Sequence, residues 1–233
     1  MSSPRVLATA FFGALALSTL PALAQSSQPQ HELQFSGVGG SNDSSRTGYL
    51  SYRGAVSGSL DDGIFVRVDG MTSRFSYATG SGNRNVARLA VFYALPVTMG
   101  KVEVGGGLSY GRERNTPAAP NDFSRVGVFV GAMAEFAPAE GHKVNVLAEF
   151  DSPDNQFYGR AFYEASFGQF GIGPVVSGVR SSNYRRTQYG LRANFEMTDN
   201  ADLTLIATTG RERISGAPSR TLRMMEAGVS LRF

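Results

Sequence analysis

The chain has 233 residues, a formal net charge of +3 and no cysteine, which excludes disulfides, thiolate metal sites and cysteine nucleophiles. Its 28 glycines, 18% charged residues and mean hydropathy of −0.14 are typical neither of a disordered chain nor of a helical membrane protein. Stability must therefore come from a closed sheet and its packing, without covalent cross-links.

The first residues have the pattern of a secretory signal peptide. Arg5 is the only charge before an almost wholly apolar run at 6–20, and Ala-Leu-Ala at 22–24 supplies a cleavage site. The apolar run is shorter than the roughly 20 residues that a membrane-spanning helix requires. We therefore expect 1–24 to be a cleaved signal peptide and 25–233 to fold as one domain.

Alternation of apolar and polar residues divides the mature chain into about twelve segments, most near the nine to eleven residues of a tilted membrane strand. In one of the clearest, Val102 and Val104 alternate with Lys101 and Glu103. In chain order, the expected strands cover 31–39, 48–57, 63–75, 86–95, 101–110, 125–136, 143–151, 156–165, 170–180, 188–197, 202–210 and 225–233. Pro174 makes the segment 170–180 the least regular, and we expect a bulge there.

The expected connections alternate in length, as they do in outer-membrane barrels with short periplasmic turns and longer external loops. Short turns are expected at 58–62, 96–100, 137–142, 166–169 and 198–201, and longer polar connections at 40–47, 76–85, 112–123, 181–187 and 211–220. The short connection 152–155 is the exception. We predict an all-β fold, a transmembrane antiparallel β-barrel of about twelve strands in the bacterial outer membrane, with both termini in the periplasm.

The last strand supports this prediction because Met225, Val229 and Leu231 share one face with a terminal Phe233. This face would meet lipid. The ending resembles that of outer-membrane proteins, which implies that Phe233 is an assembly signal for the barrel-assembly machinery. A soluble β-barrel or sandwich, with the two faces reversed, is the structural alternative.

The polar faces of the expected strands carry charges of both signs, and arginine is the commoner cation. The candidates for lining the lumen are Arg53, Arg67, Asp69, Arg88, Lys101, Glu103, Arg125, Glu135, Arg160, Glu164, Arg192, Glu196 and Glu226. Arginine pairs with carboxylates through two parallel hydrogen bonds. The set is consistent either with a self-neutralising ladder of ion pairs that keeps the lumen folded or with a polar conduit for sugars or anions. Inward aromatic residues would narrow such a conduit or stack on sugar rings.

The expected external loops have an excess of arginine over acidic residues. Their arginines are Arg46, Arg84, Arg112, Arg114, Arg185, Arg186, Arg211, Arg213 and Arg220. Arginine beside the outer leaflet is suited to binding lipopolysaccharide phosphates, although ordinary solvated loop charge is the alternative. We expect outer-membrane lipid and lipopolysaccharide as partners. No nucleic acid is expected, because the arginines are scattered over many loops without a compact fold or an aromatic platform behind them.

Neither catalysis nor a cofactor is expected from the polar residues. Outer-membrane phospholipases and deacylases need a serine beside a histidine near the outer leaflet. Here His31 opens the first strand and His142 lies in an expected periplasmic turn. The sequence Ser152-Pro153-Asp154-Asn155 is interpreted as a turn rather than as a cation site. We therefore expect no catalytic residue, no metal and no cofactor.

Several short motifs resemble the cellulose biosynthesis protein BcsS family. They are Gly48-Tyr49-Leu50, Tyr158-Gly159-Arg160-Ala161, Gly171-Ile172-Gly173-Pro174, Asn183-Tyr184 and Gln188-Tyr189-Gly190, and they span most of the mature chain. Val175 departs from the acidic residue expected after Gly-Pro. The resemblance implies a non-enzymatic outer-membrane accessory of cellulose or exopolysaccharide biosynthesis or export, with a polysaccharide or its synthase complex as partner. The alternatives are a porin-like channel for small polar or anionic solutes and a structural surface-contact barrel.

Overall fold

The structure is a computed structural model that describes residues 29–40, 45–77, 80–116, 122–215 and 218–233. The described residues form twelve strands and one short 3-10 helix, η1. The elements are β1 (His31–Gly40), β2 (Arg46–Gly58), β3 (Gly63–Tyr77), β4 (Gly80–Val97), β5 (Gly100–Thr116), β6 (Phe123–Ala139), β7 (His142–Asp151), η1 (Ser152–Asp154), β8 (Gln156–Phe167), β9 (Phe170–Arg180), β10 (Tyr184–Thr198), β11 (Ala201–Ile214) and β12 (Arg220–Arg232). None of the described residues forms a helix long and apolar enough to cross a membrane.

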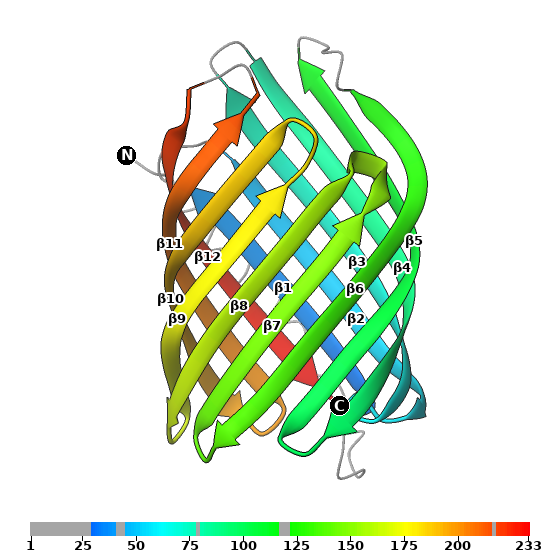
Figure 1. The fold of residues 1–233 in the computed structure, drawn as a ribbon, viewed down its shortest axis with the longest axis vertical. Helices are drawn as coiled ribbons and strands as arrows, with labels where there is room; N and C mark the ends of the chain where they lie inside the picture. Colours follow the sequence, from blue (N-terminus) through cyan, green and yellow to red (C-terminus); the bar gives the residue numbers. More distant parts are fainter. Residues whose placement is uncertain (1–28, 41–44, 78–79, 117–121, 216–217) are drawn as a thin grey trace.

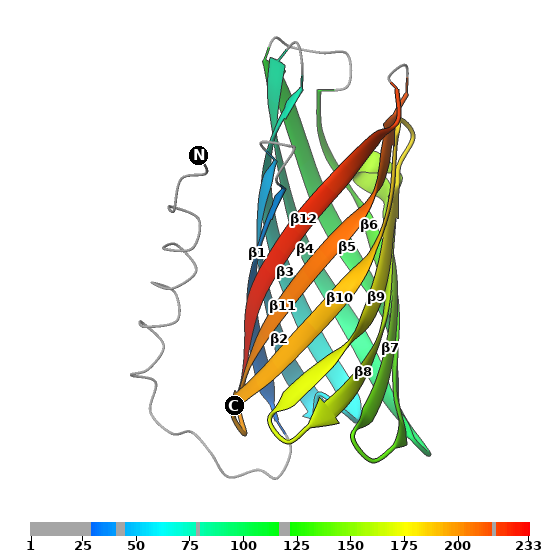
Figure 2. The ribbon, with the colours of Figure 1, turned by 90° about the vertical axis from the view of Figure 1, so that its left-hand side faces the viewer.

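Each strand pairs antiparallel with its neighbours in the chain, and β1 pairs with β12 to close the barrel (Figures 1 and 2). The closing ladder runs from Glu32 opposite Arg232 to Gly40 opposite Met224. At its end, the Phe233 backbone N–H donates to the carbonyl of His31 at 3.0 Å. The expected fold, an antiparallel outer-membrane β-barrel of about twelve strands, is confirmed.

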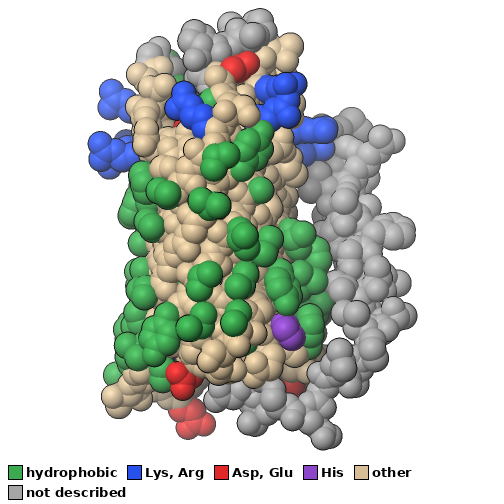
Figure 3. Space-filling model, turned by 90° about the vertical axis from the view of Figure 1, so that its right-hand side faces the viewer, with side chains coloured by type: hydrophobic (Ala, Val, Ile, Leu, Met, Phe, Trp, Pro, Cys, Tyr) green, Lys and Arg blue, Asp and Glu red, His purple; other side chains and the backbone are tan. Residues whose placement is uncertain are grey.

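Exposed hydrophobic side chains lie on the outer face of many strands over the middle of the barrel, and this zone is here called the apolar belt. Figure 3 shows part of it on one side of the barrel. Val126 and Met225 leave 72% and 73% of their surface exposed, and no protein element covers them. Large contiguous apolar surfaces of this kind are rare on soluble monomers. A closed barrel also satisfies all of its ladder hydrogen bonds internally, which is what a hydrocarbon environment requires.

The two ends of the barrel differ. Short turns join the strands at one end, here called the turn end, where β12 also finishes (Figure 1). Gly141 and Gly168 in these turns have φ values of 71° and 63°, which residues with a Cβ rarely adopt. The opposite end is called the loop end. Short turns are periplasmic in outer-membrane barrels, so we expect the loop end to face outward.

Strands β3 to β6 continue farther toward the loop end than the sequence predicts. Residues 80–85 and 112–116, expected in loops, belong to β4 and β5, and only residues 78–79 separate β3 from β4. The prediction was wrong because both faces of a strand meet water above the bilayer. In this region the backbone hydrogen bonds between strands continue. The alternation of apolar and polar residues, from which strands are predicted, ends earlier.

The expected bulge near Pro174 is also absent, since β9 keeps one register with β10 and with β8 along its described length. Pro174 lies on the outer face opposite Leu191, where its missing N–H interrupts the pairing with β8 without shifting it. The register shifts that the described ladders do contain lie close to the turn end, for example between Ala55 and Ser57.

Candidate functional site: the barrel lumen

The structure places the charged residues assigned to the lumen on the inner face, alternating with the exposed apolar residues of the outer face. They come from β2 to β6, β8, β10 and β12. Because the barrel is closed, inner side chains from strands distant in the sequence meet across the lumen. Two halves of the lumen differ in how deeply their ion pairs are buried.

The first half contains a buried network between β3, β4 and β7. Arg67 donates from Nη1 to Glu149 at 2.8 Å and from Nε to Asp69 at 2.9 Å. Arg88 donates from Nη2 to Asp151 at 2.9 Å. Strands β4, β5 and β6 lie between β3 and β7 in the sheet, so the bond between Arg67 and Glu149 crosses the lumen.

A second network lies in the same half and is built around Glu103, which is buried. Glu103 accepts a hydrogen bond from Arg53 Nη2 at 2.6 Å and forms an ion pair with Lys101 Nζ at 3.1 Å. Arg53 also bonds Glu32 at 2.9 Å, and Lys101 bonds Asp61 in the turn between β2 and β3 at 2.5 Å. Each cation therefore has two carboxylate partners, which offset part of the desolvation cost of burying charge.

A layer of three phenylalanines fills the space beside these networks. The rings of Phe65 and Phe92 are stacked with centroids 5.4 Å apart, and the ring of Phe129 lies 6.2 Å from that of Phe92. The guanidinium carbons of Arg53 and Arg88 lie 4.4 Å and 4.6 Å from the centroids of Phe65 and Phe129. Cation–π attraction of this kind stabilises arginine away from water.

Inward glycines on β5 and β6 make room for these rings, and Gly105 is the direct cross-strand neighbour of Phe92. A Cβ on Gly105 would lie 2.5 Å from Cγ of Phe92, and one on Gly131 would lie 3.2 Å from Cζ of the same ring. Large side chains on β3, β4 and β6 therefore interlock with glycines on β5 and β6. This half of the lumen is a packed core.

The other half, along β8, β10 and β12, is more open. Arg160 on β8 lies 3.8 Å from Glu226 on β12, and these side chains keep 26% and 28% of their surface accessible. The carboxylate of Asp69 in the packed half keeps 3%. Arg192 pairs with Glu164 and lies with its guanidinium carbon 4.4 Å from the centroid of Phe162. The Arg192 and Glu164 side chains keep only 15% and 8% of their surface accessible, so the accessible part of this half lies at the Arg160–Glu226 pair.

The connection between β7 and β8 narrows the lumen from the loop end. Its helix η1 contains Pro153, which is buried, and a Cβ on the inward Gly127 of β6 would lie 2.8 Å from Cδ of this proline. Arg84 on β4 donates from Nη1 to Asp154 at 2.5 Å. The short connection that the sequence left as an exception is thus a segment folded against the inner face of β5 and β6.

The arginines assigned to external loops lie instead on strands, because β2, β4, β5 and β10 to β12 extend past the apolar belt. The inner face carries Arg84, Arg186 and Arg220, and the outer face carries Arg46, Arg112, Arg114, Arg185, Arg211 and Arg213. The loop-end arginines therefore form two groups, one facing the lumen and one facing the surroundings of the barrel. An assignment to loops does not separate these groups.

Several partners in the networks were missed by sequence reasoning. Glu32 and Asp151 follow the inward parity of β1 and β7, so extending the alternation to the strand ends would have found them. Tyr49 and Ser51 on β2 both donate to Asp69, at 2.9 Å and 2.7 Å. Asp61 lies in a turn, so the alternation of residues along the strands does not predict its bond with Lys101.

Both histidines lie at the turn end, where each bonds a tyrosine of the outer face. Nδ1 of His31 is 2.9 Å from the Tyr52 hydroxyl, and Nδ1 of His142 is 2.6 Å from that of Tyr163. Within the ranges that the structure describes, no three acidic or histidine side chains group closely enough to hold a metal ion.

The sequence matches no protein-family model and no curated protein. The fold is similar to those of the NanC porin (12% identity, TM-score 0.58, covering 86% of this chain and 100% of that chain) and of the COG4313 outer membrane channel from Pseudomonas putida F1 (11%, 0.55, 92% and 99%). It is also similar to the KdgM porin in complex with disordered oligogalacturonate (9%, 0.52, 87% and 99%). Identities this low carry the fold alone, and the chain has the fold of the bacterial outer-membrane barrels.

Proposed function

We propose that the barrel is a passive, narrow outer-membrane channel for small anionic or polar solutes. The observation that carries the proposal is the eccentric, accessible half of the lumen, where Arg160 and Glu226 keep about a quarter of their surface open. A solute crossing the barrel would pass this pair. The phenylalanine layer and the buried networks of the other half would act as a rigid wall.

The preference for anions follows from how the arginines are compensated in each half. In the packed half, Arg53 and Arg67 each bond two carboxylates at 2.6–2.9 Å. In the open half, the distance between Arg160 and Glu226 is 3.8 Å, and Arg186 donates to the weakly accepting sulfur of Met224 at 3.5 Å. Guanidinium groups with spare donors in a confined space attract carboxylates and phosphates.

Two of the similar structures support the proposal by analogy. One is a porin, NanC, and another is the KdgM porin in complex with oligogalacturonate, an acidic oligosaccharide. Phe162 and Tyr158 on the inner face of β8 would supply apolar surface for the faces of sugar rings beside Arg160. The expectation of a polar or anionic cargo therefore extends to acidic sugars.

Planar-bilayer recordings test the proposal. We expect discrete conductance steps and an anion-selective reversal potential in a KCl gradient. Arg160→Gln should shift that potential toward the cation side, whereas Arg223→Gln, which removes an equal charge from the outer face of β12, should leave it unchanged. A barrel that conducts no ions, or that prefers cations before any substitution, would contradict the channel.

The second candidate is an accessory role in cellulose or exopolysaccharide biosynthesis or export. It is favoured by the motifs that resemble the BcsS family. Tyr49 and Arg160 belong to two of these motifs, and their side chains lie on the inner face. Here the lumen would contact a polysaccharide, or the barrel a synthase complex. Deleting the gene and measuring secreted polymer tests this role, and an unchanged polymer yield would remove it while leaving the channel proposal intact.

A further inference from the structure

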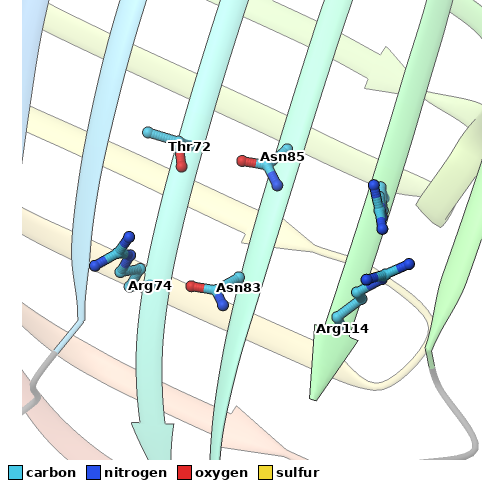
Figure 4. Close-up of a pocket in the computed structure, with 6 residues that line it drawn as sticks. Thr72, Arg74, Asn83, Asn85 and Arg114 are labelled. Atoms are coloured by element: carbon cyan, nitrogen blue, oxygen red, sulfur yellow. The ribbon is translucent and has the colours of Figure 1, made fainter. Parts of the chain in front are cut away.

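A second polar cluster lies on the outer wall of the barrel near the loop end, and its side chains point away from the lumen. It consists of Thr72, Arg74, Asn83, Asn85, Arg112 and Arg114, here called the arginine–amide face. These side chains line a shallow depression of about 310 Å³ on three adjacent strands, β3, β4 and β5 (Figure 4). Neither the lumen networks nor the proposed channel uses them.

The backbone ladders arrange the face in two rows. Thr72, Asn85 and Arg112 are direct cross-strand neighbours in one row, and Arg74, Asn83 and Arg114 form the other. In Figure 4, Asn83 lies between Arg74 and Arg114. Neighbouring strands are about 4.8 Å apart, so the face spans about 10 Å across the sheet, the scale of a phosphorylated sugar. An amide column with arginine on both sides offers many hydrogen-bond donors directed at one place.

The face carries positive charge without local compensation. In the part of the chain that the structure describes, Arg74, Arg112 and Arg114 have no carboxylate partner. The acidic residues nearest in sequence, Glu113 and Asp122, both accept from Asn115, which is buried, although they also line an adjoining pocket with Arg112 and Arg114. Inner-face arginines, by contrast, are largely matched with carboxylates. Arg160 and Arg186 are the less well matched arginines of the lumen. On the arginine–amide face, a ligand can supply the counter-charge from outside the barrel.

The position of the face along the barrel axis identifies the surroundings of such a ligand. The next row toward the turn end is Gly70, Ala87 and Tyr110, and the row after it is Val68, Leu89 and Leu108. Leu89 and Leu108 are exposed members of the apolar belt. Tyrosine favours the interface between apolar core and headgroups. The arginine–amide face therefore lies at headgroup level in the outer leaflet.

Other outward arginines continue around the loop end. Arg180, Arg185, Arg211, Arg213 and Arg223 lie outward on β9 to β12. On the side of the barrel that Figure 3 shows, basic side chains gather at the loop end, above the hydrophobic ones. Only the face on β3 to β5 combines arginines with two asparagines on an intervening strand among the described strands. Charge alone would attract anions anywhere on this rim, whereas the amide column adds directed donors at one site.

We infer that the arginine–amide face is a binding site for the phosphate groups of the phosphorylated glycolipid of the outer leaflet, the lipid A part of lipopolysaccharide. Arg74 and Arg114 bind phosphate oxygens through paired N–H donors, and Asn83 and Asn85 bond the phosphate or an adjoining sugar hydroxyl. The acyl chains then lie along Leu89 and Leu108. The site fixes the depth of the barrel in the leaflet and is independent of transport through the lumen.

Native mass spectrometry of the purified barrel with added lipid A tests the site. We expect bisphosphorylated lipid A to bind more tightly than the same glycolipid after phosphatase treatment. The double substitution Arg112→Gln/Arg114→Gln should weaken binding of the phosphorylated form about tenfold or more, since charge-assisted hydrogen bonds are lost. Because both residues are on the outer face, the variant should fold, which unchanged heat-modifiable migration on detergent gels would verify.

The matched control is Arg211→Gln/Arg213→Gln on β11. It removes the same charge at the same spacing from the loop-end outer face, where Arg211 has Thr187 and Thr221 as its cross-strand neighbours instead of asparagines. We expect binding close to that of the unsubstituted protein. An equal loss of lipid A affinity in both variants would attribute binding to diffuse surface charge and overturn the inference. Equal affinity for dephosphorylated lipid, or competition by millimolar inorganic phosphate, would overturn the lipid assignment.

Discussion

At the scale of single residues, Glu103 shows how charge is stabilised inside the barrel. Glu103 is 4% exposed, and its carboxylate pairs with Arg53 at 2.6 Å and with Lys101 at 3.1 Å. Burying charges is costly, and the pairs recover this cost only while every partner is present. The networks are therefore sensitive to the loss of a single member, although the sum of their interactions adds little to stability.

Replacing Glu103 by Gln tests this sensitivity. The change keeps the shape of the side chain but leaves Arg53 and Lys101 without their shared carboxylate. We expect a loss of about 3–5 kcal/mol in the free energy of unfolding, the usual result of breaking a buried ion pair from one side. The urea dependence of refolding into lipid vesicles measures it.

Glu196→Gln is the control for this substitution. Glu196 also lies on the inner-face parity of β10 but is exposed, and we expect its replacement to change the free energy of unfolding by less than about 0.5 kcal/mol, as is usual for surface substitutions. Similar losses in the two variants would show that burial of Glu103 is not what makes it important.

Glycine has an equally local role on β5, directly beside the phenylalanine layer. A Cβ on Gly105 would lie 2.4 Å from the Val91 carbonyl oxygen and 2.5 Å from Cγ of Phe92, closer than any relaxed contact. We expect Gly105→Ala to lower the folded fraction sharply, as read from heat-modifiable migration. Gly70→Ala on the outer face, where a Cβ meets nothing within 4 Å, should fold normally.

At the scale of elements, the β7–β8 hairpin differs from its neighbours because it ends inside the barrel. Strand β7 has 10 residues, whereas β5 and β6 have 17 each. Its helix η1 packs on the inward faces of Gly111 and Gly127, and a Cβ at either would lie 3.0 Å or less from Pro153 or Ser152 atoms. The unequal strand lengths thus create a constriction without a long loop.

We expect Arg84→Gln to raise the single-channel conductance. Arg84 bonds Asp154 and Gln156 at 2.5 Å each, so the substitution removes the charged anchor of η1. A less restrained segment blocks less of the lumen. Arg125→Gln removes an inner-face cation that contacts the Phe123 ring instead of η1, and it should leave the conductance unchanged. Equal effects of both would attribute the change to charge rather than to the constriction.

At the scale of the whole molecule, closure between β1 and β12 gives the sheet an inner and an outer face. The charged side chains fill the inner face, so the apolar belt lies on the outer face. A barrel of this form has no free edge, and its outer surface is covered with exposed valine, leucine and methionine. Burial of that surface in hydrocarbon stabilises the fold at about 25 cal/mol per Å². Insertion into the outer membrane requires export, which is the role expected for residues 1–24.

The chain purified from outer membranes should therefore begin at Gln25. Ala-Leu-Ala at 22–24 is the expected cleavage site, and intact-mass measurement would detect the loss of 1–24. Replacing Ala24 by a bulky residue should slow processing and leave precursor in the inner membrane. Recovery of the uncleaved chain from the outer membrane would contradict the signal-peptide prediction. Residues 1–24 lie outside the described part of the structure.

The sequence by itself determined the strands of the membrane region and the face that each side chain occupies. Alternation along a strand is a local geometric fact, and a lipid environment on one side makes it visible. Val104 and Glu103 could therefore be assigned to opposite faces without a structure. The same signal fades above the bilayer, where both faces meet water, so the continuation of β4 and β5 and the separation of Arg84 from Arg112 were not predictable.

Only the tertiary structure decided which inner residues meet. Arg67 and Glu149 are 82 positions apart, and their bond depends on the barrel closing with strands β3 and β7 facing each other across the lumen. The stagger of a closed sheet fixes which side chains share a height, and no local pattern records that stagger. For the same reason, the packed and open halves of the lumen, and the arginine–amide face, emerge from closure and register rather than from any segment of the chain.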